Sequence, residues 1–251
     1  MAAVTVPLVL IVEGVIGVGK STFLTSFCDV LTRAGRKVRV VPEMVEEWKA
    51  SGILEKFYTD QARWAYHFQT LAFTDLVRAV RSSWEDAVRD GIDILLVERS
   101  PCSNEIFASV LHDDGFLSEM EWRHYLSWAA EWRKLFPVIP SLFLYLTAPI
   151  EFCMERVSAR GRPGEEKIRR DYEEKLHVEH QRVFSSGKVF FGEAEVDVME
   201  VNTAEVDIRK PEGIAAVNTR AEQFLLSVGK PTLSARFGTL TSSPESEEKS
   251  S

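Results

Sequence analysis

A glycine-rich stretch near the start of the chain has the residue types and the spacing that hold phosphate groups. Residues 14–22 read GVIGVGKST, which matches the phosphate-loop pattern G-x-x-x-x-G-K-S. Glycines let the backbone approach an anion closely, with its N–H groups turned inward. The lysine adds a positive charge and the serine offers a hydroxyl to Mg²⁺. We therefore expect a site for the phosphates of ATP, formed by Gly14, Gly17, Gly19, Lys20, Ser21 and Thr22.

This pattern fixes few positions and can arise by chance, so its surroundings matter. The run 7–12 before it is continuously apolar, as in a strand that is buried on both faces. A helical pattern over 20–34 follows and ends at Gly35. A strand before the loop and a helix after it are the context that the motif requires, so we favour the functional interpretation.

Glu43 lies two residues after the end of a second predicted strand, at 37–41. In an open parallel sheet the ligand binds beyond the carboxyl ends of the strands, so this carboxylate is expected beside the phosphates. It is a candidate general base for the proton of an attacking hydroxyl. The alternative is a solvated acid in a loop, which is our interpretation of Glu46 and Glu47.

The third apolar run, at 93–97, is followed by Glu98 and Arg99. Glu98 has the position of a Walker-B-type acid and is expected to hold Mg²⁺ together with Ser21. Arg99 is placed to contact the phosphates or the carboxylate of Glu43. The alternative, an ion pair that merely caps the strand, is the weaker interpretation because the phosphate loop lies nearby.

Gln69 lies in an aromatic-rich helical segment, 64–70 (WAYHFQT). Its amide offers a donor and an acceptor on one planar group, which matches the paired edge of a pyrimidine. Because the amide can flip and so exchange its oxygen and nitrogen, it suits thymine and cytosine equally. In isolation an ordinary surface glutamine is the simpler interpretation, and we take the neighbouring His67 as structural.

Three arginines gather in 154–166 (MERVSARGRPGEE), although the protein is acidic overall. Arg156 and Arg160 share one helix face by their i, i+4 spacing, and Arg162 follows in a segment interrupted by glycine and proline. Guanidinium groups bind phosphate in two-point geometry and stabilise charge that develops during transfer. We therefore expect a mobile lid over about 156–166. The alternative is a solvated basic face paired with Glu165, Glu166 and Glu173.

The elements that position these residues alternate along the chain. Apolar runs predict strands at 7–12, 37–41, 93–97 and 141–146, with a weaker fifth at 196–201. Helical periodicity predicts helices at 20–34, 58–89, 119–135 and 165–184. Strands that alternate with helices indicate an α/β protein, here a P-loop kinase fold with a five-stranded parallel sheet flanked by helices.

The composition is typical of a globular enzyme. The 251 residues are 45% apolar and 27% charged, and the net charge of −8 argues against nucleic-acid binding. No apolar run approaches the ~18 residues of a membrane span. Three scattered cysteines predict a reducing, cytoplasmic location, and the mitochondrion and the nucleus stay open. We expect one domain over 1–228 and a disordered tail over 229–251, which is polar and of low complexity.

In combination and in this order, the motifs resemble those of the deoxyribonucleoside kinase family over about residues 8–185. The matching segments are IVEGVIGVGKST, VPEMVEEW, FYTDQARWAYHFQT, LLVERS, RVSARGRPGEE and YEEKLHVEHQRVF. The resemblance implies transfer of a phosphoryl group from ATP, with Mg²⁺, to the 5′-hydroxyl of a deoxyribonucleoside. It also implies a homodimer, for which 66–84 and 119–132 are candidate surfaces.

The resemblance further implies a role for each matching position. Glu43 is expected to be the general base, Arg99 the arginine that positions it, and Glu98 the acid associated with magnesium. The residues expected around the nucleoside are Trp48, Tyr58, Phe68, Gln69, Phe107 and Glu165. Of these, Tyr58 and Glu165 are expected to hold the sugar 3′-hydroxyl. The arginines expected over the phosphates are Arg156, Arg160 and Arg162.

Two positions depart from the family members that favour deoxycytidine and purines, which carry an Arg and an Asp in the base pocket. By spacing, the Arg position falls on Leu76 and the Asp position near Asn104. Loss of this charged pair resembles thymidine-accepting or broad members, so we expect thymidine and deoxycytidine as the leading substrates. The stretch 100–111 is about one residue short against the family pattern, which leaves the assignments of Asn104 and Phe107 open.

Two other functions stay open at this stage. A kinase for nucleoside monophosphates, similar to thymidylate kinase, shares the loop, the sheet and the lid. It needs a cationic clamp for the acceptor phosphate, and Arg99 is the one obvious candidate. A non-catalytic homologue would resemble the structural subunit of a respiratory complex. The intact set of Lys20, Ser21, Glu43, Glu98 and Arg99 favours an enzyme.

Overall fold

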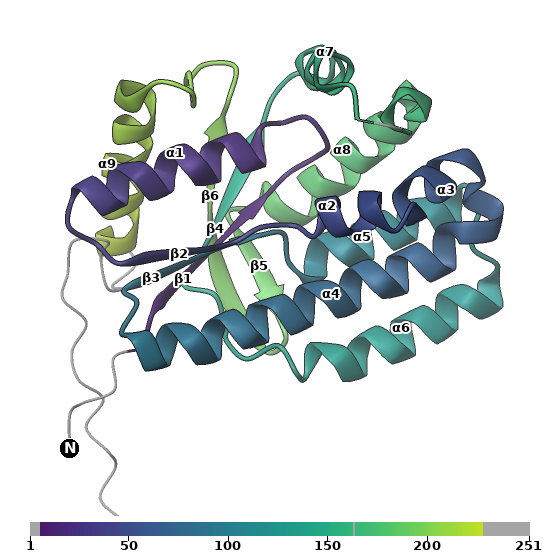
Figure 1. The fold of residues 1–251 in the computed structure, drawn as a ribbon, viewed down its shortest axis with the longest axis horizontal. Helices are drawn as coiled ribbons and strands as arrows, with labels where there is room; N and C mark the ends of the chain where they lie inside the picture. The colour runs from purple at the N-terminus through teal and green to yellow at the C-terminus, as the bar shows by residue number, and fades with distance from the viewer. Residues whose placement is uncertain (1–5, 163, 228–251) are drawn as a thin grey trace, which may run out of the picture.

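The computed structural model describes residues 6–162 and 164–227, and the tail predicted over 229–251 lies outside them. In the described residues a sheet of six strands forms the centre, in the order β2-β3-β1-β4-β6-β5 (Figure 1). The strands are β1 (Leu8–Glu13), β2 (Val38–Val41), β3 (Ile94–Glu98), β4 (Leu142–Thr147), β5 (Lys188–Phe191) and β6 (Ala194–Asn202). β1 lies inside the sheet and pairs in parallel with β3 on one side and β4 on the other.

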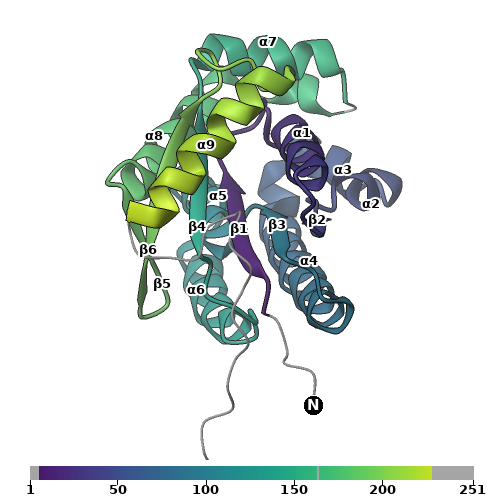
Figure 2. The ribbon, with the colours of Figure 1, turned by 90° about the vertical axis from the view of Figure 1, so that its left-hand side faces the viewer.

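Helices cover both faces of this sheet (Figure 2). α1 (Lys20–Arg33) and α9 (Pro211–Ser227) pack against each other and against one face. α4 (Gln61–Asp90) and α8 (Arg170–Phe184) cover the other face, with α5 (Pro101–Asp113) packed between them. The described residues also form α2 (Val45–Ala50), α3 (Ile53–Thr59), α6 (Glu119–Arg133), α7 (Ile150–Arg160) and the 3₁₀ turn η1 (Glu165–Lys167). Because both faces are covered, β1 and β3 are buried along their whole length.

The sheet has one strand more than the five parallel strands expected from the sequence. β5 runs antiparallel to β6 at the edge of the sheet, with Phe191 opposite Ala194. It has four residues, of which Val189 and Phe191 are buried, and it meets β6 through a turn in which Gly192 has a φ of 64°. Antiparallel neighbours need only such a turn, whereas parallel neighbours need a long crossover. The extra strand is therefore too short and too close to β6 to stand out as a separate apolar run.

The helix expected over 58–89 is α4 except at its start, where residues 58 and 59 end a separate short helix, α3. α3 and α4 meet at Asp60, whose carboxylate accepts a hydrogen bond from the backbone N–H of Arg63 at 3.1 Å and so caps α4. As a result Tyr58, near the end of α3, and Gln69, on α4, line the same cavity. None of the described helices is both long enough and apolar enough to cross a membrane.

Candidate active site

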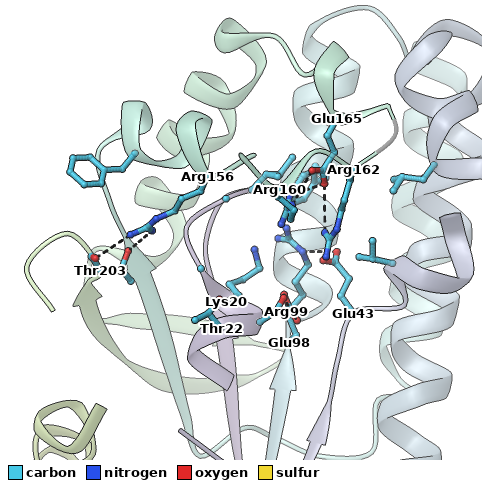
Figure 3. Close-up of a pocket in the computed structure, with 18 of the residues that line it drawn as sticks. Lys20, Thr22, Glu43, Glu98, Arg99, Arg156, Arg160, Arg162, Glu165 and Thr203 are labelled. Atoms are coloured by element: carbon cyan, nitrogen blue, oxygen red, sulfur yellow. Dashed lines mark hydrogen bonds and ion pairs between the residues drawn. The ribbon is translucent and has the colours of Figure 1, made fainter. Parts of the chain in front are cut away.

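A cavity of about 790 Å³ lies at the carboxyl ends of the parallel strands, where charged side chains from several elements converge (Figure 3). Most residues predicted from the sequence line it: Gly17, Gly19, Lys20, Ser21, Thr22, Glu43, Trp48, Tyr58, Phe68, Gln69, Glu98, Arg99, Asn104, Phe107, Arg156, Arg160, Arg162 and Glu165. Gly14 and Leu76 are not part of its wall. Gly14 lies at the base of the loop, where its carbonyl accepts hydrogen bonds. Leu76 is buried on α4, one helical turn beyond Ala72, which does line the cavity.

The cavity has two parts, which are lined by different residues. The acceptor half is lined by Glu43, Trp48, Phe57, Tyr58, Phe68, Gln69, Ala72, Arg99, Asn104 and Phe107. The donor half is lined by the phosphate loop, by side chains of α7 and by the segment 203–209.

Close packing shapes the phosphate loop between β1 and α1. Gly17 has a φ of 78°, and a Cβ atom there would stand 2.3 Å from the carbonyl oxygen of Cys153 in α7, so no side chain fits. The Nζ atom of Lys20 donates to the carbonyl oxygens of Gly14 and Val15 at 3.1 and 2.9 Å. Burial lowers the pKa of Lys20 to about 8. Since both partners are neutral carbonyls, an incoming anion does not have to displace a carboxylate from this lysine.

Arg99 connects the ends of β1, β2 and β3. Its Nε donates to Glu43 Oε1 at 2.7 Å, and its Nη1 donates to the carbonyl oxygen of Gly14 at 3.2 Å. The guanidinium carbon lies 4.6 Å from the centre of the Phe107 ring, in cation–π geometry. The backbone of Arg99 has a φ of 70°, in the left-handed region that a non-glycine residue occupies only at a cost. Arg99 is thus held on three sides, and it fixes the Glu43 carboxylate beside the phosphate loop.

The carboxyls of Glu43 and Glu98 have pKa values that are displaced in opposite directions. Burial would raise the pKa of Glu43, but the positive charges of Arg99 and Lys20 outweigh it, and this pKa lies below its ordinary value. Burial, and then the negative charge of Glu43, raise the pKa of Glu98. Environments that separate the pKa values of neighbouring acids prepare them for different roles. Glu43 is therefore ionised at neutral pH and able to accept a proton.

Ser21 and Glu98 present oxygen atoms that suit a magnesium ion. The Ser21 hydroxyl, at the start of α1, lies 3.2 Å from each carboxylate oxygen of Glu98. Mg²⁺ takes oxygen ligands, and it usually binds to one or two protein groups together with phosphates and water. The hydroxyl and the carboxylate fit this pattern, since both lie beside the loop that would hold the phosphates.

Aromatic rings surround one buried amide in the acceptor half. Phe57 stacks on Phe68 with 4.6 Å between ring centres, and Trp48 meets Phe68 edge-on at 5.2 Å. Gln69 is 2% exposed and lines the cavity. Within residues 6–162 and 164–227 its amide has no hydrogen-bond partner. Because buried polar groups are nearly always hydrogen-bonded, this amide is suited to bind a ligand.

Asn104 uses its amide differently, although it lines the same half of the cavity. With the amide oriented to satisfy both neighbours, its nitrogen donates to the Ser100 carbonyl at 3.1 Å. Its oxygen accepts from the backbone N–H of Phe73 at 3.2 Å. Asn104 therefore ties α5 to α4, and Gln69 is the better candidate for reading a base.

The three arginines predicted over the phosphates are not equivalent. Arg160 pairs with Glu165 through hydrogen bonds of 3.0 and 2.7 Å, and Arg162 lies 3.6 Å from the same carboxylate (Figure 3). Arg156 instead donates to a phosphate-loop carbonyl at 2.9 Å and to the Thr203 hydroxyl at 3.1 Å. Arg156 therefore ties the phosphate loop to the chain after β6, a contact that the motif did not predict.

The segment 203–209 is the largest group of lining residues that sequence reasoning missed. It contributes Thr203, Ala204, Glu205, Asp207, Ile208 and Arg209 to the donor half. In the sequence it is a polar stretch without a motif. Its position directly after the predicted strand 196–201 is the signal that could have found it, because ligands bind where parallel strands end.

Two buried acids near the phosphate loop were also missed. Glu13 ends β1, and Glu173 lies on α8, where the alternative interpretation of the arginine segment had placed it on a solvated face. Both side chains are fully buried. Burial raises the pKa of each to about 7. At neutral pH a large fraction of each acid is therefore uncharged.

The fold and this cavity together define a P-loop phosphotransferase. A strand leads into a phosphate loop, acids lie at the ends of β2 and β3, and arginines from α7 and the residues after it line the same cavity. Residues 10–224 match the family model described as deoxynucleoside kinase. The chain belongs to the deoxynucleoside kinase family, and it is therefore a phosphotransferase that acts on deoxyribonucleosides.

Relatives with assigned names are similar over most of their length. A probable deoxycytidine kinase of fowlpox virus is 31% identical over 192 residues, which cover 76% of this chain and 77% of the viral protein. Mouse deoxycytidine kinase is 31% identical over 218 residues, covering 76% of this chain and 82% of the mouse protein. A mitochondrial deoxyguanosine kinase of Xenopus laevis is 30% identical over 190 residues, covering 68% and 70%. These names differ in the base, so they leave the base preference of this chain open.

Proposed function

We propose that the protein phosphorylates the 5′-hydroxyl of pyrimidine deoxyribonucleosides, namely thymidine and deoxycytidine, with ATP as the donor, in nucleotide salvage. In this arrangement the triphosphate lies in the phosphate loop and the nucleoside lies between Gln69 and Glu43. The family supports a deoxyribonucleoside as the acceptor. The preference for a pyrimidine rests on the acceptor half of the cavity.

The observation that carries the proposal is the ion pair between Glu43 and Arg99 at 2.7 Å. An acceptor that already bears a phosphate needs an unmatched cation at this end of the cavity. The charge of Arg99 is matched by Glu43, and the two arginines that follow along the cavity share Glu165. This balance of charges favours a neutral nucleoside over a nucleoside monophosphate, the acceptor of a thymidylate-kinase-like enzyme.

The environment of Gln69 supports a pyrimidine as the base. Thymine and cytosine each present one donor and one acceptor at adjacent positions of the paired edge, in opposite order. A flip of the glutamine amide matches it to either base. Trp48, Phe57 and Phe68 form an apolar wall beside it. A flat ring gains from aromatic contacts of this kind.

Side chains of the donor half support a place for the base of ATP. Phe152 on α7 is 46% exposed, and its ring centre lies 6.0 Å from the guanidinium of Arg156. The segment 203–209 lines the same half. An aromatic ring and a guanidinium group both stack on nucleobases, so we place the adenine beside this pair.

The proposed mechanism assigns a step to each charged group. Glu43 accepts the proton of the 5′-hydroxyl while the 5′-oxygen attacks the γ-phosphorus, and the bond from that phosphorus to the β–γ bridging oxygen breaks to release ADP. Lys20 stabilises the charge that develops on the phosphoryl oxygens, with help from the arginines at 160 and 162. A magnesium ion held by Ser21 and Glu98 would neutralise part of the phosphate charge.

The test is a panel of acceptors with purified full-length protein, ATP and Mg²⁺. Thymidine, deoxycytidine, deoxyadenosine, deoxyguanosine and thymidine monophosphate are supplied separately, and the phosphorylated product is quantified. We expect the highest kcat/KM for thymidine and deoxycytidine. Turnover of thymidine monophosphate alone would show a monophosphate kinase, and turnover of no acceptor would show a non-catalytic homologue. A clear purine preference would contradict the assignment of the base.

A further inference from the structure

The aromatic wall of the acceptor half contains the indole of Trp48, whose N–H is bonded to a residue outside the aromatic cluster. Trp48 is 6% exposed and meets Phe68 edge-on, and Phe68 in turn stacks on Phe57. Edge-on and stacked contacts depend on the relative tilt of the rings. The orientation of the indole therefore sets the orientation of the wall that a base would contact.

A carboxylate on another helix satisfies the only hydrogen-bond donor of this indole. The Nε1–H of Trp48 donates to Oδ2 of Asp75 at 2.9 Å. Trp48 belongs to α2 and Asp75 belongs to α4, so the bond joins elements that are separated along the chain. An indole has one donor and no acceptor, and a bond to a charged oxygen is stronger than a neutral one. This contact therefore constrains the tilt of the ring, together with its packing against Phe68.

The same contact connects the parts of the site that act on the substrate. α2 begins two residues after Glu43, and Trp48 anchors this short helix on α4. α4 also carries Gln69, the unpartnered amide of the acceptor half. Asp75 lies six residues further along α4, about 9 Å away. A change in the Trp48–Asp75 bond would therefore move the aromatic wall relative to the amide.

We propose that Asp75 is a positioning residue for the nucleoside: through the Trp48 indole it holds the aromatic wall at the orientation that the base requires. The substrate named here rests on the proposed function. Asp75 itself does not line the cavity, so it acts through the indole and not by touching the nucleoside. Its effect should fall on the nucleoside and spare ATP.

The first test compares two substitutions that keep the size of the side chain. Asp75→Leu removes the acceptor, and we expect KM for the nucleoside to rise about 10-fold, because the buried indole N–H loses its partner. Asp75→Asn keeps an acceptor oxygen and should restore KM to within about twofold of the wild type. KM for ATP should stay unchanged in both. Asp86→Leu makes the same change on α4 at a position outside the cavity wall and serves as the matched control.

The second test asks whether Asp75 acts through the indole. Trp48→Phe removes the N–H, so Asp75→Leu in that background should leave the nucleoside KM of Trp48→Phe unchanged. An equal rise of KM in both backgrounds would overturn the proposal. So would a nucleoside KM in Asp75→Leu equal to that of the wild type. Thermal unfolding of each variant shows whether it is folded at the assay temperature.

A third measurement does not depend on turnover. The indole N–H signal of Trp48 in a ¹⁵N–¹H NMR spectrum is the one that Trp48→Phe removes. We expect Asp75→Leu to shift this signal and speed its exchange with water, and Asp75→Asn to leave exchange slow. If the position and exchange rate of the indole signal stay the same in Asp75→Leu, the contact itself is contradicted. A wild type that phosphorylates no nucleoside, with the indole signal behaving as expected, would contradict the proposed function instead, and the two failures are thus distinguishable.

Discussion

The donor half and the acceptor half of the cavity hold their cations in different ways. In the donor half, Lys20 and Arg156 donate to backbone carbonyls and to a hydroxyl, which carry no net charge. In the acceptor half, Arg99 pairs with the carboxylate of Glu43. Among the described residues, Lys20 and Arg156 therefore have no acid as a hydrogen-bond partner, whereas the charge of Arg99 is matched by Glu43.

If the protein works as proposed, this difference explains how one cavity can bind two substrates of very different charge. A triphosphate that enters the donor half can replace neutral carbonyls around the cations, and it gains the full attraction of a partly desolvated charge. A nucleoside that enters the acceptor half meets a balanced ion pair, so it does not have to bring a charge of its own. In the proposed function, the partners of Lys20, Arg156 and Arg99 thus distinguish the place of the donor from that of the acceptor.

The largest expected effect is at the ion pair of the acceptor half. Glu43→Gln keeps the shape of the side chain but removes the proton acceptor, so we expect kcat to fall about 10²- to 10⁴-fold. Glu46→Gln, an exposed acid on α2, is the control and should keep wild-type turnover. A steady-state assay with thymidine or deoxycytidine measures both. If Glu43→Gln retains near-normal turnover while folded, this carboxylate is not the base.

The next largest effect is in the donor half. Lys20→Met keeps the length of the side chain and removes its charge, so we expect kcat/KM for ATP to fall about 10²- to 10³-fold. Binding of the nucleoside, measured by calorimetry without ATP, should change little. Lys49→Met removes a lysine that pairs with Glu46 on the surface and is the matched control. Equal losses of ATP and nucleoside binding would show that the two halves are not independent.

A smaller effect, with a defined pH dependence, is expected at Arg99. Arg99→Met removes the charge that lowers the pKa of Glu43 and the bond that holds its carboxylate, so kcat should fall about 10²-fold. The pKa of Glu43 should rise. Since the base works in its ionised form, the acid limb of the kcat–pH profile should move to higher pH. An acid limb that does not move would assign that limb to another group.

The smallest effect on turnover is expected at Glu173, behind the phosphate loop. Its pKa is about 7 in the folded protein and 4.5 for an ordinary glutamate, so the folded state binds more protons between these values. Its contribution to the free energy of unfolding therefore falls as the pH rises from about 4.5 to 7 and is constant above. Glu173→Gln should remove this loss. The free energy of unfolding of the variant, relative to the wild type, should therefore be about 3 kcal/mol higher at pH 8 than at pH 4.

Urea unfolding of wild type and Glu173→Gln at the two pH values measures that gain. Activity of the variant at pH 6.5 should stay close to that of the wild type, because the acid is largely uncharged there. An equal stability difference at both pH values would show that the carboxyl does not titrate in this range.

The sequence was sufficient for most of the fold and for the ends of the strands. Buried apolar runs located β1, β3 and β4 within one or two residues, since a strand covered on both faces has few polar positions. β2 is partly exposed and contains Arg39, and it was located equally closely. The sequence was not sufficient for β5, whose exposed positions, Lys188 and Phe190, alternate with buried ones over only four residues.

The sequence predicted which residues lie together best where they follow strands that end at one edge of the sheet. Lys20, Glu43 and Arg99 follow strands that end at the same edge, and they lie together. Prediction failed where contacts between distant segments decide the outcome. The bond from Arg156 to Thr203 depends on where β6 ends, and whether Leu76 joins the cavity wall depends on how α4 packs against its neighbours. Neither can be read from local spacing.

The position of β1 within the sheet also has a consequence for the synthesis of the protein. Leu8 pairs with Ile94 and Leu10 pairs with Leu142, so the partners of β1 leave the ribosome long after β1 does. Contacts of such long range form slowly and expose apolar segments in the meantime. A nascent chain that stops before β4 therefore contains every residue of the phosphate-loop motif, but β1 lacks its second neighbour. Such a chain presents an exposed apolar strand, prone to aggregation, in place of a nucleotide site.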